Sequence, residues 1–256
     1  MTLNGGPLQY TSALDPSPLT AEEEAMLVFA ACGVTGYALG ELPYATGTEK
    51  DAGAGNVMSQ FRARTAISGD AIHADSVFVI NDEGTWFVPR PQDLDASQVK
   101  TLVREARKGD VLGFYEAVRV RLSDRRTDVE REIPFVPAFN KWSANRPGTT
   151  YFLPVHELSA FYMNVALTAF DEEFGYFIVD DTARFAPAGI GKFAKSKGGH
   201  LYDDPKAGRT IPLGVLDTWI HEFAAIEQGA ILQNLGLMTQ ALGLGGFAHF
   251  AHHPWA

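Results

Sequence analysis

The stretch TWIHEFAAIEQGAILQNLGLMTQALGLGG, residues 218–246, decides the fold that we expect for this chain. Its apolar residues recur with the spacing i, i+4, i+7 and i+11 at Ile231, Leu235, Met238 and Leu242. This spacing predicts one face of an α-helix, which over residues 218–242 would be about 37 Å long. Glycines at positions 243, 245 and 246 would end the helix, because glycine adopts positive φ without a steric penalty. A helix of this length crosses a whole small domain, so we expect it at the centre of the fold.

Small residues along this helix would let another helix or a flat ligand come close; they are Ala224, Ala225, Gly229, Ala230 and Gly236. Gln233 and Asn234 lie among apolar neighbours in the middle of the helix. A buried amide needs hydrogen-bond partners. Two explanations stay open for this pair: a hydrogen bond to a neighbouring helix, or one to a ligand.

Composition narrows the class of protein. The chain has 256 residues, of which 46% are hydrophobic and 20% charged, as in an ordinary globular protein with one large domain. A net charge of −10 argues against a nucleic-acid surface, which needs clustered Lys and Arg. The single cysteine, Cys32, excludes an intrachain disulfide. No uncharged apolar run is long enough to span a membrane, and the N-terminus lacks the basic-then-apolar pattern of a signal peptide. We therefore expect a cytoplasmic protein that contacts neither membrane nor nucleic acid.

Outward from the long helix, the patterns predict a single α+β domain over residues 1–256. The expected segments, in chain order, are an irregular lead-in over 1–18, a helix from Thr20 to about Cys32, a long loop over 39–60, a hairpin of strands 76–80 and 85–88, helices over 96–108 and 112–120, a strand over 151–155, a helix over 156–170, a strand over 174–179 and a lid-like loop over 186–214. Thr20 with Glu23 predicts the helix start, and Asn81 to Gly84 predicts the hairpin turn.

Three stretches carry a family pattern. TAISGDAIHADSVFVI, residues 65–80, has a small-residue turn with a serine before a strand, residues 121–125 (RLSDR) fit R-x-S-x-R, and the long helix contains EQGAILQNLGLMTQALGLGG. Together they resemble the nitroreductase-like flavoprotein family. The preceding stretch AEEEAMLVFAACGVTG, residues 21–36, is similar to the helix before the turn in the subgroup of azoline-forming oxidases and dehalogenases.

This resemblance implies a nitroreductase-like α+β fold: a central, mainly antiparallel sheet flanked by helices, with the long helix at the centre. It implies an FMN cofactor bound at a homodimer interface and hydride transfer through the flavin N5 from NAD(P)H or a substrate. No side-chain catalyst is then required, because the cofactor carries the chemistry. The FMN-binding residues implied by the motifs are Ser68, Gly69, Arg121, Ser123, Arg125, Asn234, Gly245 and Gly246.

The FMN phosphate would need arginines or backbone N–H groups. The arginines considered for it are Arg62, Arg64, Arg121, Arg125 and Arg126. In the family, R-x-S-x-R normally precedes the serine turn, whereas here it follows the turn. A second register stays open, in which Ser143-Ala144-Asn145-Arg146-Pro147 is the serine turn.

Other signals predict less. Residues 249–253 (HFAHH) have a spacing that could serve a metal, but no Cys or carboxylate lies beside them, so we expect no metal site there. Glu222 and Glu227 are i, i+5 and are not expected to form a carboxylate pair.

Two functions follow from the sequence. The first is an FMN-dependent oxidoreductase acting on a small conjugated or aromatic molecule. The alternative is a flavin-free binding or scaffolding module, which the displaced arginine motif and the short C-terminal stretch favour.

Overall fold

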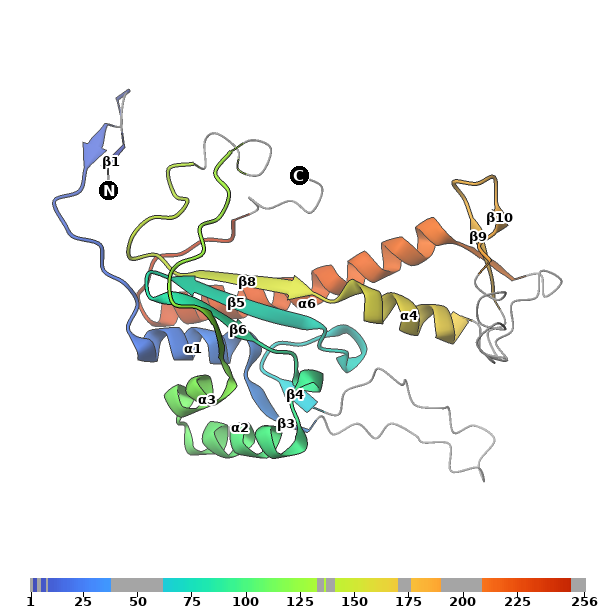
Figure 1. The fold of residues 1–256 in the computed structure, drawn as a ribbon, viewed down its shortest axis with the longest axis horizontal. Helices are drawn as coiled ribbons and strands as arrows, with labels where there is room; N and C mark the ends of the chain where they lie inside the picture. Colours follow the sequence, from blue (N-terminus) through green and yellow to red (C-terminus); the bar gives the residue numbers. More distant parts are fainter. Residues whose placement is uncertain are drawn as a thin grey trace.

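The longest element of the protein is the helix α6 (Leu213–Ala241), around which the other elements lie (Figure 1). The structure is a computed structural model and describes residues 2–3, 6–7, 9–37, 62–132, 136, 141–169, 176–189 and 209–249. The predicted loop over 39–60 and the middle of the predicted lid lie outside these residues, as do His252 and His253. The protein is α+β, with helices and sheets in which all strand pairs but one are antiparallel among the described residues.

The predicted long helix is confirmed, and it begins five residues earlier than the sequence pattern suggested. Its buried face consists of Leu216, Ile220, Ala224, Glu227, Ile231 and Leu235. Met238 and Leu242 pack, partly buried, against the same core as Ile231. Gly243 follows the helix with φ +69°, so the expected glycine stop is present.

The main sheet has the strand order β7 (Val120–Ser123), β6 (Gly84–Val88), β5 (Asp75–Asn81) and β8 (Tyr151–His156), and every neighbouring pair is antiparallel. The β5–β6 hairpin confirms the predicted turn, with Asn81 opposite Gly84. Val77 and Val79 on β5 are fully buried and face the core beneath the sheet. The motif at residues 121–125 follows the predicted helix, which ends at Val118, and its first three residues belong to β7, a strand that the sequence patterns did not predict.

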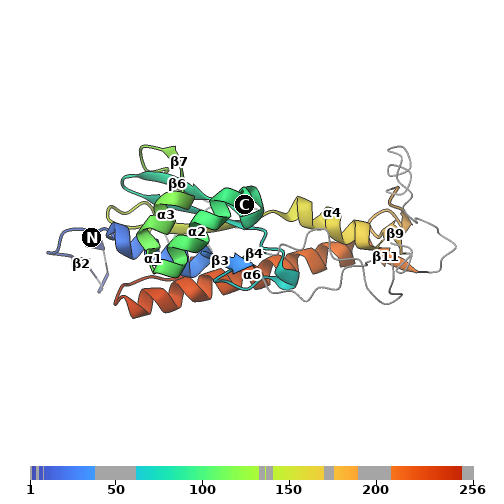
Figure 2. The same ribbon diagram turned by 90° about the horizontal axis from the view of Figure 1, so that it is seen from below.

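Three helices complete the core: α1 (Ala21–Cys32), α2 (Ala96–Lys108) and α3 (Val111–Val118). α1 begins at the predicted cap, Thr20, whose hydroxyl accepts from the Glu23 N–H at 3.2 Å. The Glu23 carboxylate also accepts from the Thr20 N–H at 2.8 Å, which completes a capping box. α6 lies on the side of the molecule opposite β6 and β7 (Figure 2). Side chains of α1, α3, α6 and the sheet form one continuous hydrophobic core.

Two short strands lead from α1 to the main sheet. β3 (Val34–Tyr37) pairs with β4 (Arg62–Arg64), and the chain then bends through the short 3-10 helix η1 (Gly69–Ala71) into β5. A second 3-10 helix, η2 (Pro91–Asp93), precedes α2. The sequence patterns did not predict β3, β4 or η2. Near the N-terminus, β1 (Thr2–Leu3) pairs with β2 (Tyr10–Thr11) within the predicted irregular lead-in.

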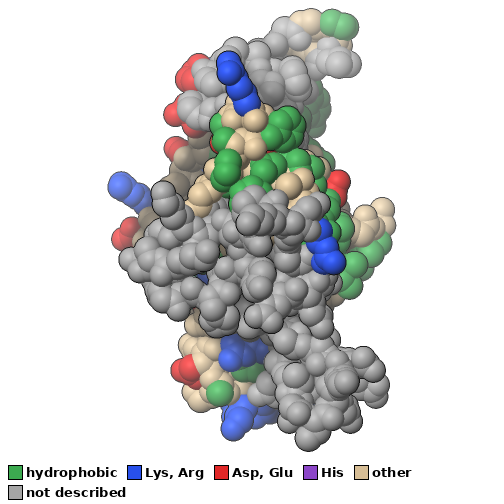
Figure 3. Space-filling model, turned by 90° about the vertical axis from the view of Figure 1, so that its right-hand side faces the viewer, with side chains coloured by type: hydrophobic (Ala, Val, Ile, Leu, Met, Phe, Trp, Pro, Cys, Tyr) green, Lys and Arg blue, Asp and Glu red, His purple; other side chains and the backbone are tan. Residues whose placement is uncertain are grey.

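The N-terminal half of α6 extends away from the main sheet beside α4 (Leu158–Ala169). A small sheet of β10 (Ala186–Pro187), β9 (Phe177–Asp180) and β11 (Thr210–Pro212) lies at this distal end. The described ends of the predicted lid therefore form β10, β11 and the first turn of α6. Hydrophobic side chains reach the surface at this end (Figure 3), and Met163, Phe185 and Trp219 are all exposed.

We predict that Thr20→Ala lowers the free energy of unfolding by about 1 kcal/mol, because it removes the side-chain partner of the Glu23 N–H. Urea unfolding monitored by circular dichroism measures the change. Ser17→Ala, at an exposed position outside the helix, is the control and should change stability by less than about 0.5 kcal/mol. Equal stability of the two variants would contradict the assigned cap.

Candidate functional site

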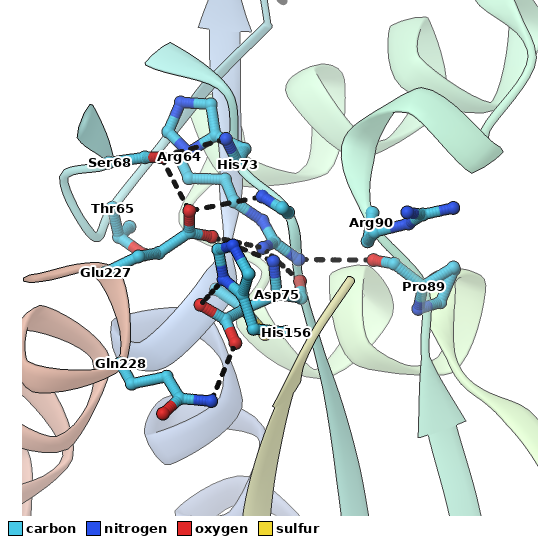
Figure 4. A network of polar contacts seen from close by, with 12 residues as sticks. Arg64, Thr65, Ser68, His73, Asp75, Pro89, Arg90, His156, Glu227 and Gln228 are labelled. Atoms are coloured by element: carbon cyan, nitrogen blue, oxygen red, sulfur yellow. Dashed lines mark hydrogen bonds and ion pairs between the residues drawn. The ribbon is translucent and has the colours of Figure 1, made fainter. Parts of the chain in front are cut away.

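The candidate site lies where the bend between β4 and β5, residues 65–74, crosses α6 (Figure 4). Two non-glycine residues of this bend have positive φ, Ala71 at 55° and His73 at 50°. Residues other than glycine rarely adopt this backbone conformation. Where one does, the surrounding contacts hold it in place. The bend is therefore a strained segment with a defined shape.

Glu227 of α6 is the group that holds the bend. Its side chain is almost completely buried and accepts three hydrogen bonds, from the Ser68 hydroxyl at 2.5 Å, the Ala74 N–H at 3.1 Å and the Asp75 N–H at 2.9 Å. A buried carboxylate without such donors would be strongly destabilising. Glu227 thus connects the long helix to the serine turn and to the first residue of β5.

Arg64 supplies the opposite charge. One terminal nitrogen donates to the Asp75 carbonyl at 2.7 Å and lies 4.0 Å from Glu227 Oε1, and the other donates to the Pro89 carbonyl at 3.2 Å. Its side chain is 1% exposed. The guanidinium is therefore committed to the protein interior, where it compensates the charge of Glu227.

A second buried carboxylate lies beside this pair. Asp75 is fully buried; its Oδ2 lies 3.1 Å from His156 Nδ1, and its Oδ1 accepts from Gln228 Nε2 at 3.4 Å. Three side chains each offer one possible metal-ligand atom here, and these atoms all lie within 4.8 Å of one another. The three residues are Asp75, His156 and Glu227. The cluster therefore joins β5, β8 and α6 and is the one place among the described residues where His and acidic side chains group in this way.

His73 is a buried neutral imidazole in the bend. Burial is the main cause that lowers its pKa, and the nearby Arg64 charge lowers it further, to about 4. The backbone N–H of His73 donates to the Ser68 hydroxyl oxygen at 2.9 Å. The ring is therefore uncharged at neutral pH and packs as part of the bend.

The structure brings two of the predicted FMN-binding residues into this cluster, Arg64 and Ser68, but their partner is Glu227. Gly69 does allow a close approach, as expected. The group that approaches it is the Phe223 ring, since a Cβ on Gly69 would lie 2.2 Å from Phe223 Cδ1. The inner contact between the bend and α6 is thus filled by the chain's own side chains. A flavin ring placed between these two segments does not fit.

Other predicted residues also contact the protein itself. Arg62 donates to the carbonyls of Pro91 and, at 2.7 Å, of Leu94. Asn234 Nδ2 lies 3.0 Å from the Ala30 carbonyl and 3.3 Å from the Thr65 carbonyl. Of the two explanations for the mid-helix amides, the described contacts of Asn234 therefore favour the bond to a neighbouring helix. Gly245 and Gly246 follow α6 at its C-terminal end, about 20 Å along the helix from Glu227.

The R-x-S-x-R motif lies away from the serine turn. Arg121 donates to the Glu83 carbonyl at 2.9 Å, and the Ser123 hydroxyl donates to the Arg125 carbonyl at 2.9 Å. β7 pairs with the hairpin end of β6, whereas the bend enters β5 at Asp75. This places the motif about 17 Å along the strands and about 10 Å across them from the bend. The structure does not bring the arginines of this motif to Ser68.

The second register would make residues 143–147 the serine turn that binds the ligand. The central residue of this segment, Asn145, instead contacts other parts of the protein. Asn145 has φ 55°, its side chain exchanges hydrogen bonds with the backbone of Val129, and its N–H donates to the Tyr151 hydroxyl at 2.7 Å. These bonds fix the connection that leads into β8.

Sequence reasoning missed Glu227, Asp75 and His156 as members of one cluster. A signal for Glu227 was present, because position 227 falls on the same helix face as Ile220, Ala224 and Ile231. An acid on an otherwise apolar buried face requires specific partners. Nothing local in the sequence indicates that those partners are Ser68 and the start of β5.

We predict that Glu227→Gln lowers the free energy of unfolding by about 3 kcal/mol or more, because it leaves Arg64 buried without its opposite charge. Glu222→Gln, an exposed position on the same helix, should change it by less than about 0.5 kcal/mol. Chemical denaturation of both variants measures the difference. Similar losses in the two variants would exclude a special role for Glu227.

We also predict that His73 makes the fold acid-sensitive. The unfolded chain binds a proton at His73 with a pKa near 6.5, and the folded protein only near 4, so stability falls as the pH drops through this interval. The loss is at most about 1.4 kcal/mol per pH unit. His73→Asn, which tolerates positive φ, should flatten the dependence, whereas the exposed His221→Gln should leave it unchanged. An unaltered slope in His73→Asn would refute the assignment.

Comparison with known proteins adds no relative. No protein-family model matches the sequence, and no curated protein or solved structure matches it. Within the part of the chain that the structure describes, no helix is long and apolar enough to cross a membrane.

Proposed function

We propose that the protein is an FMN-dependent oxidoreductase that works as a homodimer on a small conjugated or aromatic substrate. The observation that carries the proposal is the docking of the serine turn on a long helix that also exposes several large apolar side chains. This pairing of segments agrees with the resemblance found in the sequence. FMN would supply two-electron chemistry through its ring N5.

The open face of α6 supports a second copy of the chain as the partner. It carries exposed apolar side chains opposite the buried face, namely Trp219, Ile226, Leu232 and Leu237. Between them, Gly229 and Gly236 have open space, since no other atom lies within 4 Å of a Cβ built on either residue. These apolar side chains alternate along the helix with exposed polar ones such as Glu222 and Gln233. A second helix would cover the apolar ones, and the small residues would let the two helices approach closely.

The flavin would lie on the outward side of the bend, since the inner side is filled by Phe223 and by the Ser68–Glu227 hydrogen bond. Ile67 precedes Ser68 and is 70% exposed, and Ile226 precedes Glu227 and is 52% exposed. These two side chains flank the contact and offer apolar surface to a planar ring. Glu227 and Arg64 act as positioning residues, because they set the shape of the bend without facing the ligand.

The five arginines considered for the phosphate do not gather at one point, and Arg126 forms an ion pair with Asp82 at 2.7 Å. Arg62 and Arg64 donate to backbone carbonyls, and Arg121 and Arg125 lie on or beside β7. This distribution favours the second candidate function, a flavin-free module that binds a partner through the open face of α6. The two candidates share the dimer surface and differ in the cofactor.

The cofactor is tested on the purified full-length chain. We expect a visible flavin spectrum, or FMN uptake on titration, and bleaching of that spectrum by NAD(P)H. A colourless protein that ignores added FMN would reject the oxidoreductase and favour the module. Flavin binding without bleaching by NAD(P)H would move the proposal to an oxidase that takes its electrons from substrate.

The dimer surface is tested with Ile226→Glu. We expect a dimer for the unchanged chain in analytical ultracentrifugation and a folded monomer for the variant, because a charge in the interface cannot be solvated. Val120→Glu, on an apolar side chain of similar exposure on β7, should remain dimeric. A monomeric unchanged chain, or equal dimerisation of both variants, would rule out this face.

A further inference from the structure

His156 has an unusual environment in the buried cluster. Its side chain is 5% exposed, and its Nε2 has no hydrogen-bond partner among the residues that the structure describes. Its Nδ1 lies 3.1 Å from a carboxylate oxygen of Asp75, which is itself fully buried. Figure 4 shows the imidazole ring between the carboxylates of Asp75 and Glu227.

Neither neutral form of this imidazole is satisfied. With the proton on Nδ1, the Nε2 lone pair is buried without a donor. With the proton on Nε2, a buried N–H has no acceptor, and the Nδ1 lone pair faces a carboxylate oxygen at 3.1 Å. Protonation of both nitrogens still leaves the Nε2 N–H unpaired. In the first form Nδ1–H donates to Asp75, and a cation beside Nε2 would supply the partner that the Nε2 lone pair lacks.

The surrounding charges also favour a cation. Asp75 and Glu227 bring two negative charges into the interior, and Arg64 is the cation within ion-pair distance of Glu227. Their ligand atoms and one nitrogen of His156 lie within 4.8 Å of one another. A metal ion with bonds of about 2.0–2.2 Å separates two of its ligand atoms by about 3.3 Å in a tetrahedral site and by at most about 4.4 Å. Small side-chain movements would therefore complete a site.

We propose that Asp75, His156 and Glu227 bind a divalent transition-metal ion, each through one atom. One imidazole and two carboxylates suit Zn²⁺, Mn²⁺ or Fe²⁺. The outer contacts are those that a metal site needs, because the Ala74 and Asp75 N–H groups and Gln228 hold the two carboxylates in place. Arg64 lies 4.0 Å from Glu227 and weakens the attraction for a cation.

The experiment titrates chelator-treated full-length protein with Zn²⁺ and, separately, with Co²⁺. We expect one ion per chain, a higher unfolding temperature with Zn²⁺, and visible Co²⁺ absorption bands. His156→Gln should weaken binding by at least about 10-fold and remove the bands. His221→Gln is the matched control, because this histidine lies on α6 with a 46% exposed side chain, and it should bind as the unchanged chain does.

If His156→Gln does not fold, Asp75→Asn replaces it, and the Co²⁺ spectrum of the unchanged chain remains an independent measurement. No Co²⁺ bands and no Zn²⁺-dependent stabilisation in the unchanged chain would overturn the proposal. Equal binding by His156→Gln would also overturn it, since the ion would then lie elsewhere. Both measurements work with or without flavin, so their failure would leave the proposed oxidoreductase untouched.

Discussion

The arrangement of the site depends on one buried carboxylate. Glu227 accepts from the Ser68 hydroxyl and from two consecutive N–H groups at the start of β5, and its charge is compensated by Arg64. A carboxylate in the interior is tolerated only with such donors. The need to satisfy it fixes where the bend crosses α6, and it holds the left-handed conformations of Ala71 and His73. The geometry of the bend is thus a consequence of an electrostatic requirement of the helix.

Elements coded by local patterns could be predicted from the sequence. The long helix, the β5–β6 hairpin and the cap at Thr20 each depend on residues a few positions apart, and the structure has all three. β3 and β4 could not be found, because they are short and become strands only by pairing across a long connection. For the same reason the sequence patterns did not predict β7, which holds the first three residues of the motif at 121–125 and pairs with β6.

The site shows the same division. Ser68 could be selected from the sequence because its turn resembles a family pattern, and Arg64 was one of the five arginines considered for a phosphate. Their partner could not be selected, because Glu227 lies 159 positions from Ser68. Asp75 and His156 meet through the register of β5 against β8, which sequence patterns do not determine. The sequence thus indicated some of the residues of the site, whereas the tertiary structure determines which residues they contact.

α6 passes without interruption from the main core to the distal cluster of α4 and the small sheet. Its 29 residues form a rod of about 43 Å, with the Glu227 contact near its middle. The half after Glu227 is packed in the main core through Ile231 and Leu235, so the half before it is an arm that leaves this core near the Glu227 contact. Any tilt imposed on the distal arm, by a second subunit or a bound molecule, must move the serine bend or break the hydrogen bonds that anchor it. The distal arm and the bend are therefore mechanically coupled, although the outermost residues of the arm lie more than a dozen positions from Glu227.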